Sequence, residues 1–334
     1  MPDRFSIISN FLAGCWPDQS YQMQAISGDA SFRRYFRIKQ QGQSYILMDS
    51  PPALEDGERF VAVQQAFAGA GLRVPTIIHT DLAQGLLLLE DLGDVLLLSQ
   101  LTLENACEWY RSALQPLTQI RQISATSQGP LPAFDRAFLL REMQIFIDWF
   151  VKVHLQLELR SAELATLQQT FEMLAASALE QPQAGMHRDY HARNLMLLAG
   201  NQLAVIDFQD IVTGPVSYDA VSLLKDCYIR WPAALVTLLR DEFFAELQRQ
   251  KVLDAQWDNT RFAQSFDWMG LQRHIKVCGI FCRLYHRDQK AGYLADLPRV
   301  LEYLLDVAQA YPQLASFHTL MTERILPAFA RVTR

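Results

Sequence analysis

Two aspartates and an asparagine follow one another in the order that phosphoryl transfer requires. Asn194 lies five residues after Asp189, and Asp207 lies thirteen residues after Asn194. The reaction needs a carboxylate that orients the accepting hydroxyl and takes its proton, and oxygen ligands that hold Mg²⁺ on the nucleotide phosphates. We therefore predict Asp189 as the catalytic base and Asn194 and Asp207 as the metal ligands. The alternative is that all three residues cap turns, as Asp and Asn often do.

The elements that must position these residues fall into two parts. The first part contains short strands around one helix, and the second is mainly helical, with one pair of strands that carries Asn194 and Asp207. This pattern predicts an α+β fold of two lobes, and a cleft between two lobes is a common place for a nucleotide. We place a nucleotide-binding lobe at 1–92, with a hinge at about 89–93, and a helical lobe with the catalytic loop and acceptor site at 93–334. The expected strands are 21–27, 33–39, 44–49, 77–80, 86–90, 194–198 and 203–207, and the expected helices are 56–69, 103–120, 135–158, 162–179, 219–229, 233–250, 260–287, 298–310 and the tail from 316.

Composition predicts a globular cytoplasmic protein with no general affinity for nucleic acid or membranes. A net charge of −6 over 334 residues gives no bulk attraction for nucleic acid or for an anionic membrane. We find neither a signal-peptide pattern nor an apolar run long enough to span a bilayer. The five cysteines are scattered, which favours a reducing compartment. Cys278 and Cys282 lie one helical turn apart and could bind a metal, although buried thiols are the simpler interpretation.

The motif around the predicted base resembles a known family. His187-x-Asp189-x-x-x-x-Asn194, followed by Ile206-Asp207-Phe208, is similar to the aminoglycoside phosphotransferase and choline kinase superfamily. The segment 88–93 is similar to the hinge of that superfamily. Longer motifs resemble the bacterial anomeric kinases of N-acetylmuramate and N-acetylglucosamine, and the resemblance extends from about residue 26 to 298. These motifs are 28–37, 187–196, 205–210, 214–215, 218–219 and 266–276.

The resemblance implies a two-lobed protein-kinase-like fold that uses ATP and Mg²⁺. It implies phosphorylation of the anomeric hydroxyl of an amino sugar recovered from peptidoglycan, with Glu90 and Leu92 of the hinge at the nucleotide. In such a fold Asp219, which we predict as a helix N-cap, also braces the backbone of the catalytic loop. From their residue type and place, we expect His187 and His191 to support this loop, and direct chemistry is the alternative. Two alternatives remain: an aminoglycoside or other metabolite kinase of the same superfamily, and a catalytically silent nucleotide-binding regulator.

The chain departs from the kinase pattern at the phosphates. Kinases usually carry a Lys on the third strand that binds the α- and β-phosphates. Here the inward position of that strand holds Met48, and the strand contains no Lys. We expect Arg33 or Arg34 to supply the missing cation, because a guanidinium binds phosphate with two parallel hydrogen bonds. The alternative is that both arginines lie on a solvated strand face. We expect the backbone of the turn that contains Gly28 and Ser31 to approach the phosphates as well.

The predicted helix 260–287 is rich in cations, and these cations help to identify the molecule that accepts the phosphoryl group. The lactyl carboxylate of N-acetylmuramate needs a cation, and Arg273 is our first choice, with His274 beside it. Trp268 could stack on a sugar ring or belong to the core. Asp210 could reach the metal or the sugar, or be a solvated turn residue. A polycationic aminoglycoside would need an acidic pocket instead, so this helix favours the amino sugar.

Overall fold

The computed structural model describes residues 3–17, 20–26 and 32–333. Contacts between residues divide them into two compact units. The first comprises the described residues up to Gln100 together with Ala125–Pro130 and Arg193–Asp210, and the second comprises Leu101–Ser124, Leu131–Ala192 and the residues from Ile211 onward. Gly28 and Ser31, which we predicted near the phosphates, lie outside the described residues.

The first unit is built on a five-stranded antiparallel sheet with the strand order β1-β2-β3-β5-β4. Its strands are β1 (Gln22–Ile26), β2 (Arg34–Gln40), β3 (Gln43–Asp49), β4 (Ile77–Asp81) and β5 (Leu86–Glu90). The turn between β2 and β3 contains Gln41 and Gly42, both with positive φ, which suits the twist of a tight hairpin. All five predicted strands of this region are confirmed to within two residues at each end.

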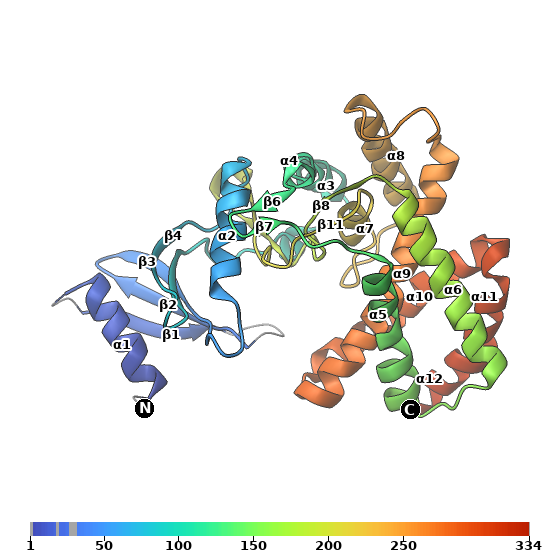
Figure 1. Cartoon of the computed structure of the whole chain (residues 1–334), viewed down its shortest axis with the longest axis horizontal. Helices are drawn as coiled ribbons and strands as arrows, with labels where there is room; N and C mark the ends of the chain where they lie inside the picture. The colour runs from blue at the N-terminus through green and yellow to red at the C-terminus, as the bar shows by residue number, and fades with distance from the viewer. Residues whose placement is uncertain (1–2, 18–19, 27–31, 334) are drawn as a thin grey trace. The chain divides into compact units, whose positions relative to one another are not determined.

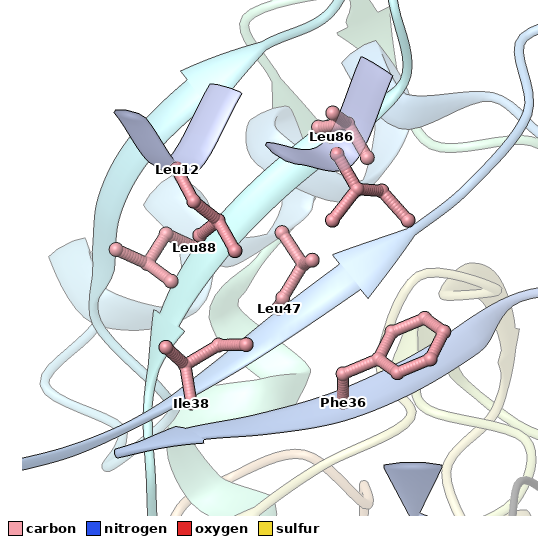
Figure 2. Packing of buried hydrophobic residues seen from close by; sticks show 7 residues of the cluster. Leu12, Phe36, Ile38, Leu47, Leu86 and Leu88 are labelled. Carbon is pink, nitrogen blue, oxygen red and sulfur yellow. The ribbon is translucent and has the colours of Figure 1, made fainter. Parts of the chain in front are cut away.

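Helix α1 (Arg4–Cys15) covers one face of this sheet and was not predicted. Asp3 caps it, because its carboxylate accepts hydrogen bonds from the Phe5 and Ser6 backbone. Ile8 and Leu12, one helical turn apart, are fully buried. Figure 2 shows how the helix packs on the strands; the buried partners are Phe36, Ile38, Leu47, Leu86 and Leu88. Because polar residues stand between these two positions, the apolar stripe is short and the helix was not recognised from the sequence.

A second set of elements in this unit carries the predicted metal ligands. The hairpin of β9 (Leu195–Leu197) and β10 (Leu203–Val205) turns at Ala199–Asn201. Its backbone is hydrogen-bonded to the chain on both sides, from Leu197 N to Val95 O at 2.8 Å and from Val205 N to Arg73 O at 2.8 Å. The remaining elements of the unit are α2 (Gly57–Gly69), η1 (Leu97–Gln100), β6 (Ala125–Thr126) and β7 (Gly129–Pro130).

The second unit is mainly helical, and its longest helix is α9 (Asn259–Asp288), which contacts α5, η2, α6, α7 and α10 (Figure 1). No helix of the described residues is long and apolar enough to cross a membrane. The other helices are α3 (Ala106–Leu114), α4 (Leu117–Gln122), α5 (Arg136–Ile145), η2 (Phe146–His154), α6 (Ser161–Glu180), α7 (Tyr218–Leu224), α8 (Ala233–Arg249), η4 (Ala291–Asp296), α10 (Leu297–Ala310), η5 (Pro312–Leu314), α11 (Ala315–Leu320), η6 (Met321–Ile325) and α12 (Leu326–Val332).

Three predicted helix boundaries in this unit were wrong, and one strand pair was missed. The predicted helix 103–120 is two helices that meet at Pro116, which cannot donate the backbone hydrogen bond that would continue the first. The predicted helix 135–158 ends at His154, its second half being a π-helix, and the predicted helix 219–229 ends at Leu224. The missed strands are β8 (Gln183–Met186) and β11 (Val212–Pro215), which pair antiparallel.

Candidate active site

The first unit contains a cavity of about 480 Å³, a size that suits a small ligand. It is lined by β2, by the segment that follows β5, and by residues of the β9–β10 hairpin and its flanks. Among the predicted nucleotide and metal residues, it brings together Arg33, Glu90, Leu92, Asn194 and Asp207. The structure thus gathers residues that lie far apart in the sequence around one hollow.

Strand register decides which predicted cation faces this cavity. Tyr35 lies opposite Met48, and both side chains point to the cavity side of the sheet, since paired residues share a face. Arg33 lines the cavity. Arg34, one residue further, points to the face that α1 covers, and its Nε lies 2.8 Å from Asp49 Oδ2. Of the two arginines, the structure therefore brings only Arg33 to the cavity.

Asn194 and Asp207 lie side by side at the base of the hairpin. Asn194 Nδ2 donates to Asp207 Oδ2 at 3.3 Å, and the Ile206 N–H donates to the carbonyl of Asn194 at 3.1 Å. Asp207 has a φ of 61°, a left-handed conformation that Asp tolerates better than most residues. An amide oxygen and a carboxylate are hard oxygen donors of the kind Mg²⁺ prefers, alongside phosphates and water. The two side chains thus fit the predicted metal, with Asp207 supplying the charge.

The backbone that carries Asp207 is anchored to helix α2. Phe208 packs against two rings of this helix, with centroid distances of 5.1 Å to Phe60 and 5.3 Å to Phe67. Arg59 of the same helix donates from Nε to the carbonyl of Gln209 at 2.8 Å, and Gln209 Nε2 donates to Asp207 Oδ1 at 2.9 Å. These contacts hold the Asp207 carboxylate and the backbone that follows it.

Ion pairs hold the chain that leaves β5. Glu90 is hydrogen-bonded to the Arg73 guanidinium, which lowers its pKa from the ordinary value, and it accepts a further bond from Thr76 Oγ1 at 3.0 Å. Arg37, on the cavity side of β2, donates to Asp91 from Nε at 2.7 Å and to Asp94 from Nη2 at 2.7 Å. Glu90 and Asp91 are therefore held by arginines, Arg73 from the loop before β4 and Arg37 from β2.

In the second unit, Asp219 braces the loop that carries Asp189. Its Oδ2 accepts the backbone N–H of His187 at 2.7 Å, and its Oδ1 accepts that of Arg188 at 3.0 Å. Arg188 has a φ of 79°, so these bonds offset the cost of a strained backbone next to the predicted base. The bracing role predicted for Asp219 is confirmed. The predicted N-cap is wrong, because Ser217 occupies that position of α7.

The histidines beside the predicted base are buried. His187 is fully buried and contacts the ring of Tyr190, with a centroid distance of 5.7 Å. His191 is 8% exposed and contacts the ring of Tyr228 at 5.3 Å. These packed positions agree with the predicted supporting role of both residues.

Cations surround Asp189. Burial by itself raises the pKa of the Asp189 carboxyl. The neighbouring positive charges outweigh burial and hold this pKa well below the ordinary value of Asp. In order of effect they are Lys276, Arg273, His191 and Arg188. The carboxylate therefore stays ionised over the whole neutral range and can accept a hydrogen bond from a hydroxyl. A base of such low pKa is suited to orient the hydroxyl and to take its proton late in the reaction.

Glu142 joins two of these cations and was not assigned from the sequence. Its Oε1 lies 2.8 Å from Arg188 Nη2 and 3.3 Å from Lys276 Nζ. Lys276 also donates to the Tyr218 hydroxyl at 3.3 Å, and Gln272 donates to Glu142 Oε2 at 3.3 Å. Glu142 is 5% exposed. Its place three residues after a buried Leu, on the apolar face of α5, was the signal that could have revealed it.

The residues of α9 that we predicted at the substrate are buried. Arg273 is 2% exposed, so the alternative of a solvated helix face is wrong. His274 stacks on Tyr303 at 4.5 Å, and burial lowers its pKa to about 3, so that it is neutral. Trp268 is 8% exposed and contacts Tyr311 edge-on. Asp210 is exposed and belongs to the first unit.

The two neighbouring cysteines of α9 are free and buried, as the simpler interpretation expected. Burial raises the pKa of Cys278 well above its ordinary value and that of Cys282 to about 12. Both side chains are therefore protonated at neutral pH and behave as apolar core residues.

Comparison with known proteins shows the family of this chain. The family model of the phosphotransferase enzyme family matches residues 22–262, more than half of the chain. The N-acetylmuramate/N-acetylglucosamine kinase of Pseudomonas aeruginosa is 40% identical over 95% of this chain and 96% of its own length. The protein of the same name from Neisseria meningitidis is 36% identical over 95% of each chain.

Solved structures with low sequence identity share the fold. The gentamicin complex of the aminoglycoside phosphotransferase APH(2")-IIa superposes with a TM-score of 0.63 at 12% identity, covering 91% of this chain and 99% of the other. The ethanolamine kinase of Plasmodium vivax gives 0.62 at 11% identity, covering 89% and 84%. The predicted α+β kinase-like fold, with a sheet-rich N-terminal part and a mainly helical C-terminal part, is confirmed. The chain belongs to the phosphotransferase enzyme family.

Proposed function

We propose that this protein transfers the γ-phosphoryl group of ATP to the anomeric hydroxyl of N-acetylmuramate and N-acetylglucosamine. The observation that carries the proposal is the relatedness over nearly the whole chain: four relatives, 29–40% identical over 87–95% of this chain, bear the name of that sugar kinase. An aminoglycoside phosphotransferase of the same fold was solved with ADP bound, which supports the use of ATP. We place the reaction in the cytoplasm, on sugars recovered from peptidoglycan.

The predicted base, metal ligands and hinge residues each have a role in the proposed reaction. Asp189 would orient the anomeric hydroxyl and take its proton, and Lys276 and Arg273 would keep the carboxylate ionised. Asn194 and Asp207 would hold Mg²⁺, which neutralises charge on the nucleotide phosphates when it is bound. Residues 1–92 would form the nucleotide-binding lobe, with Glu90 and Leu92 in the hinge and residues 93–334 as the helical lobe.

An assay with four candidate acceptors distinguishes the candidate functions. The protein is incubated with ATP, Mg²⁺ and one of N-acetylmuramate, N-acetylglucosamine, kanamycin or choline, and ADP release and the phosphorylated product are measured. We expect turnover with the two amino sugars and a product phosphorylated at the anomeric oxygen. Turnover with kanamycin alone would show an antibiotic kinase, and nucleotide binding without turnover would show a regulator.

The same assay tests Arg273 as the partner of the lactyl carboxylate. Its Nε and Nη1 are buried and have no hydrogen-bond partner among the described residues, which supports a ligand at this side chain. We expect Arg273→Lys to raise the KM for N-acetylmuramate about tenfold or more and to change that for N-acetylglucosamine little, because only the first sugar carries a carboxylate. Equal effects on both sugars would contradict this role, and retained N-acetylglucosamine turnover controls for folding.

Removing a metal ligand should change the Mg²⁺ dependence of the reaction. We expect Asp207→Ala to lower kcat by about 10²–10³-fold, since it removes the charged ligand that stabilises the transferring group. Asn194→Ala should raise the Mg²⁺ concentration for half-maximal rate, because one neutral ligand is lost. A titration of the initial rate with Mg²⁺ at saturating ATP measures both. An unchanged Mg²⁺ dependence in both variants would contradict the assignment of this pair.

A further inference from the structure

Three arginines line the cavity of the first unit, and no lysine is among the described residues that line it. Arg37 already binds two carboxylates, since its Nη1 lies 2.8 Å from Asp94 Oδ2 and its Nε lies 2.7 Å from Asp91 Oδ2. Its charge is therefore used to hold the chain that leaves β5. The other two arginines that line the cavity are Arg33 and Arg193.

Arg33 is placed and held in a way that suits this task. Its side chain is 8% exposed, and its Nη2 lies 2.9 Å from Oε2 of Glu55, whose side chain is 17% exposed. Glu55 precedes helix α2 in the turn that follows Pro51, where its own N–H donates to the carbonyl of Pro51 at 3.0 Å. The ion pair thus joins the beginning of β2 to the beginning of α2.

The surroundings of Arg33 place it toward the metal-ligand end of the cavity. Its guanidinium carbon lies 5.9 Å from the ring centroid of Phe60, which packs against Phe208, the residue after Asp207. The hydroxyl of the buried Tyr35 interacts electrostatically with both groups. Burial raises the pKa of this hydroxyl to about 12, Arg33 lowers the pKa, and Asp207 raises it. Arg33 and Asp207 line the same cavity, so phosphates at a metal held by Asp207 would lie in the cavity that Arg33 also lines.

The strand position that carries the lysine in kinases holds no cation in this chain. Met48 of β3 lies opposite Tyr35 and is fully buried, so the third strand supplies no cation to the cavity. Kinases pair their strand lysine with a helix glutamate, and the pair must be formed for phosphate binding. Arg33 and Glu55 are a cation and an anion that lie just before β2 and just before α2. A guanidinium has five N–H groups pointing in several directions, so it can bind a carboxylate and a phosphate at once.

We propose that Arg33 is the phosphate-binding cation of the nucleotide cavity and that Glu55 is the residue that positions it, so that this ion pair replaces the strand lysine and its glutamate. The inference rests on the proposed use of ATP. It goes further by assigning a role to Glu55, which no sequence motif singled out. It also assigns phosphate binding to Arg33 and not to its neighbour Arg34.

The test compares ligands with and without phosphates. Binding of ATP with Mg²⁺, of ADP and of adenosine to the full chain is measured by isothermal titration calorimetry. We expect Arg33→Gln to weaken ATP and ADP binding about 10–100-fold, the range for a lost charged hydrogen bond, and adenosine binding less than twofold. Arg33→Lys should recover part of the loss. Lys39→Gln, which removes an exposed cation from β2, should leave all three affinities unchanged.

Glu55 needs a measurement that a purely structural role would not change. We expect Glu55→Gln to raise the KM for ATP about three- to tenfold with the KM for the sugar unchanged, because Arg33 loses its charged partner but remains in place. Glu55→Asp should restore part of the ATP affinity. Thermal unfolding of each variant controls for folding.

Three outcomes would overturn the inference. Parallel losses for ATP and adenosine would show that Arg33 supports the cavity without binding phosphate. Unchanged ATP affinity in Arg33→Gln, with a loss in Arg193→Gln, would transfer the role to Arg193. In both cases ATP-dependent sugar turnover by the wild type would leave the proposed function intact. A wild-type chain that binds neither ATP nor ADP would overturn the proposed function and this inference together.

Discussion

Asp189→Asn is expected to lower kcat for the amino sugar by about 10²–10⁴-fold, with the KM for ATP nearly unchanged. The amide has the size of the carboxylate but cannot take a proton from the acceptor hydroxyl. The variant should still bind nucleotide, since the predicted metal ligands are untouched. Steady-state ADP release at saturating ATP and sugar measures the effect. Full activity in this variant would refute Asp189 as the base.

The stability of the same variant has a distinct pH dependence. The cations around Asp189 hold its folded pKa below the ordinary value of about 3.9. A carboxyl with a lowered folded pKa stabilises the protein above its unfolded pKa, and this contribution is lost as the pH falls toward the folded pKa. The difference in Tm between wild type and Asp189→Asn should therefore be largest at neutral pH and shrink below about pH 4. A difference that grows on acidification would contradict this electrostatic account.

Glu142→Ala is expected to lower the free energy of unfolding by about 3–5 kcal/mol. The change removes the carboxylate that compensates Arg188 and Lys276, and the latter is 7% exposed. Leaving buried cations without a partner is among the largest single-residue penalties in a folded protein. Urea unfolding followed by circular dichroism measures the change at neutral pH.

An exposed ion pair provides the matched control for Glu142. Arg136 and Glu172 join two helices at the surface, with side chains 61% and 47% exposed. Glu172→Ala should therefore change the free energy of unfolding by less than about 1 kcal/mol. In the double variant Glu142→Ala/Lys276→Met, part of the lost stability should return, because one uncompensated cation is gone. Equal effects of Glu142→Ala and Glu172→Ala would show that the buried network is not stabilising.

Local patterns predicted much of the first unit. Alternating apolar residues and the Gln41-Gly42 turn predicted β2 and β3 nearly to the residue, because hairpin pairing depends on the strands and the turn between them. Helix α1 escaped prediction because only Ile8 and Leu12 form its buried stripe. The pair of β8 and β11 escaped for another reason: these short strands are separated by 25 residues, and their pairing leaves no periodic signal in either segment.

Charged residues in the second unit were the hardest to predict. A run of cations on α9 suggested a solvated or substrate-facing surface, yet Arg273 and Lys276 are buried. Their burial depends on Glu142 from another helix and on Asp189 from the loop, which compensate their charge. No single segment contains both halves of this network, so composition within a helix cannot reveal it.

The sequence alone predicted phosphoryl transfer for this protein, and the tertiary structure decided which side chains face the cavity. The order and spacing of Asp189, Asn194 and Asp207 are properties of the chain, and they predict phosphoryl transfer without coordinates. Whether Arg33 or Arg34 faces the cavity depends on the register of β2, because neighbouring residues of a strand point to opposite faces. Packing likewise paired Arg33 with Glu55, whose place in the sequence gives no sign of that role.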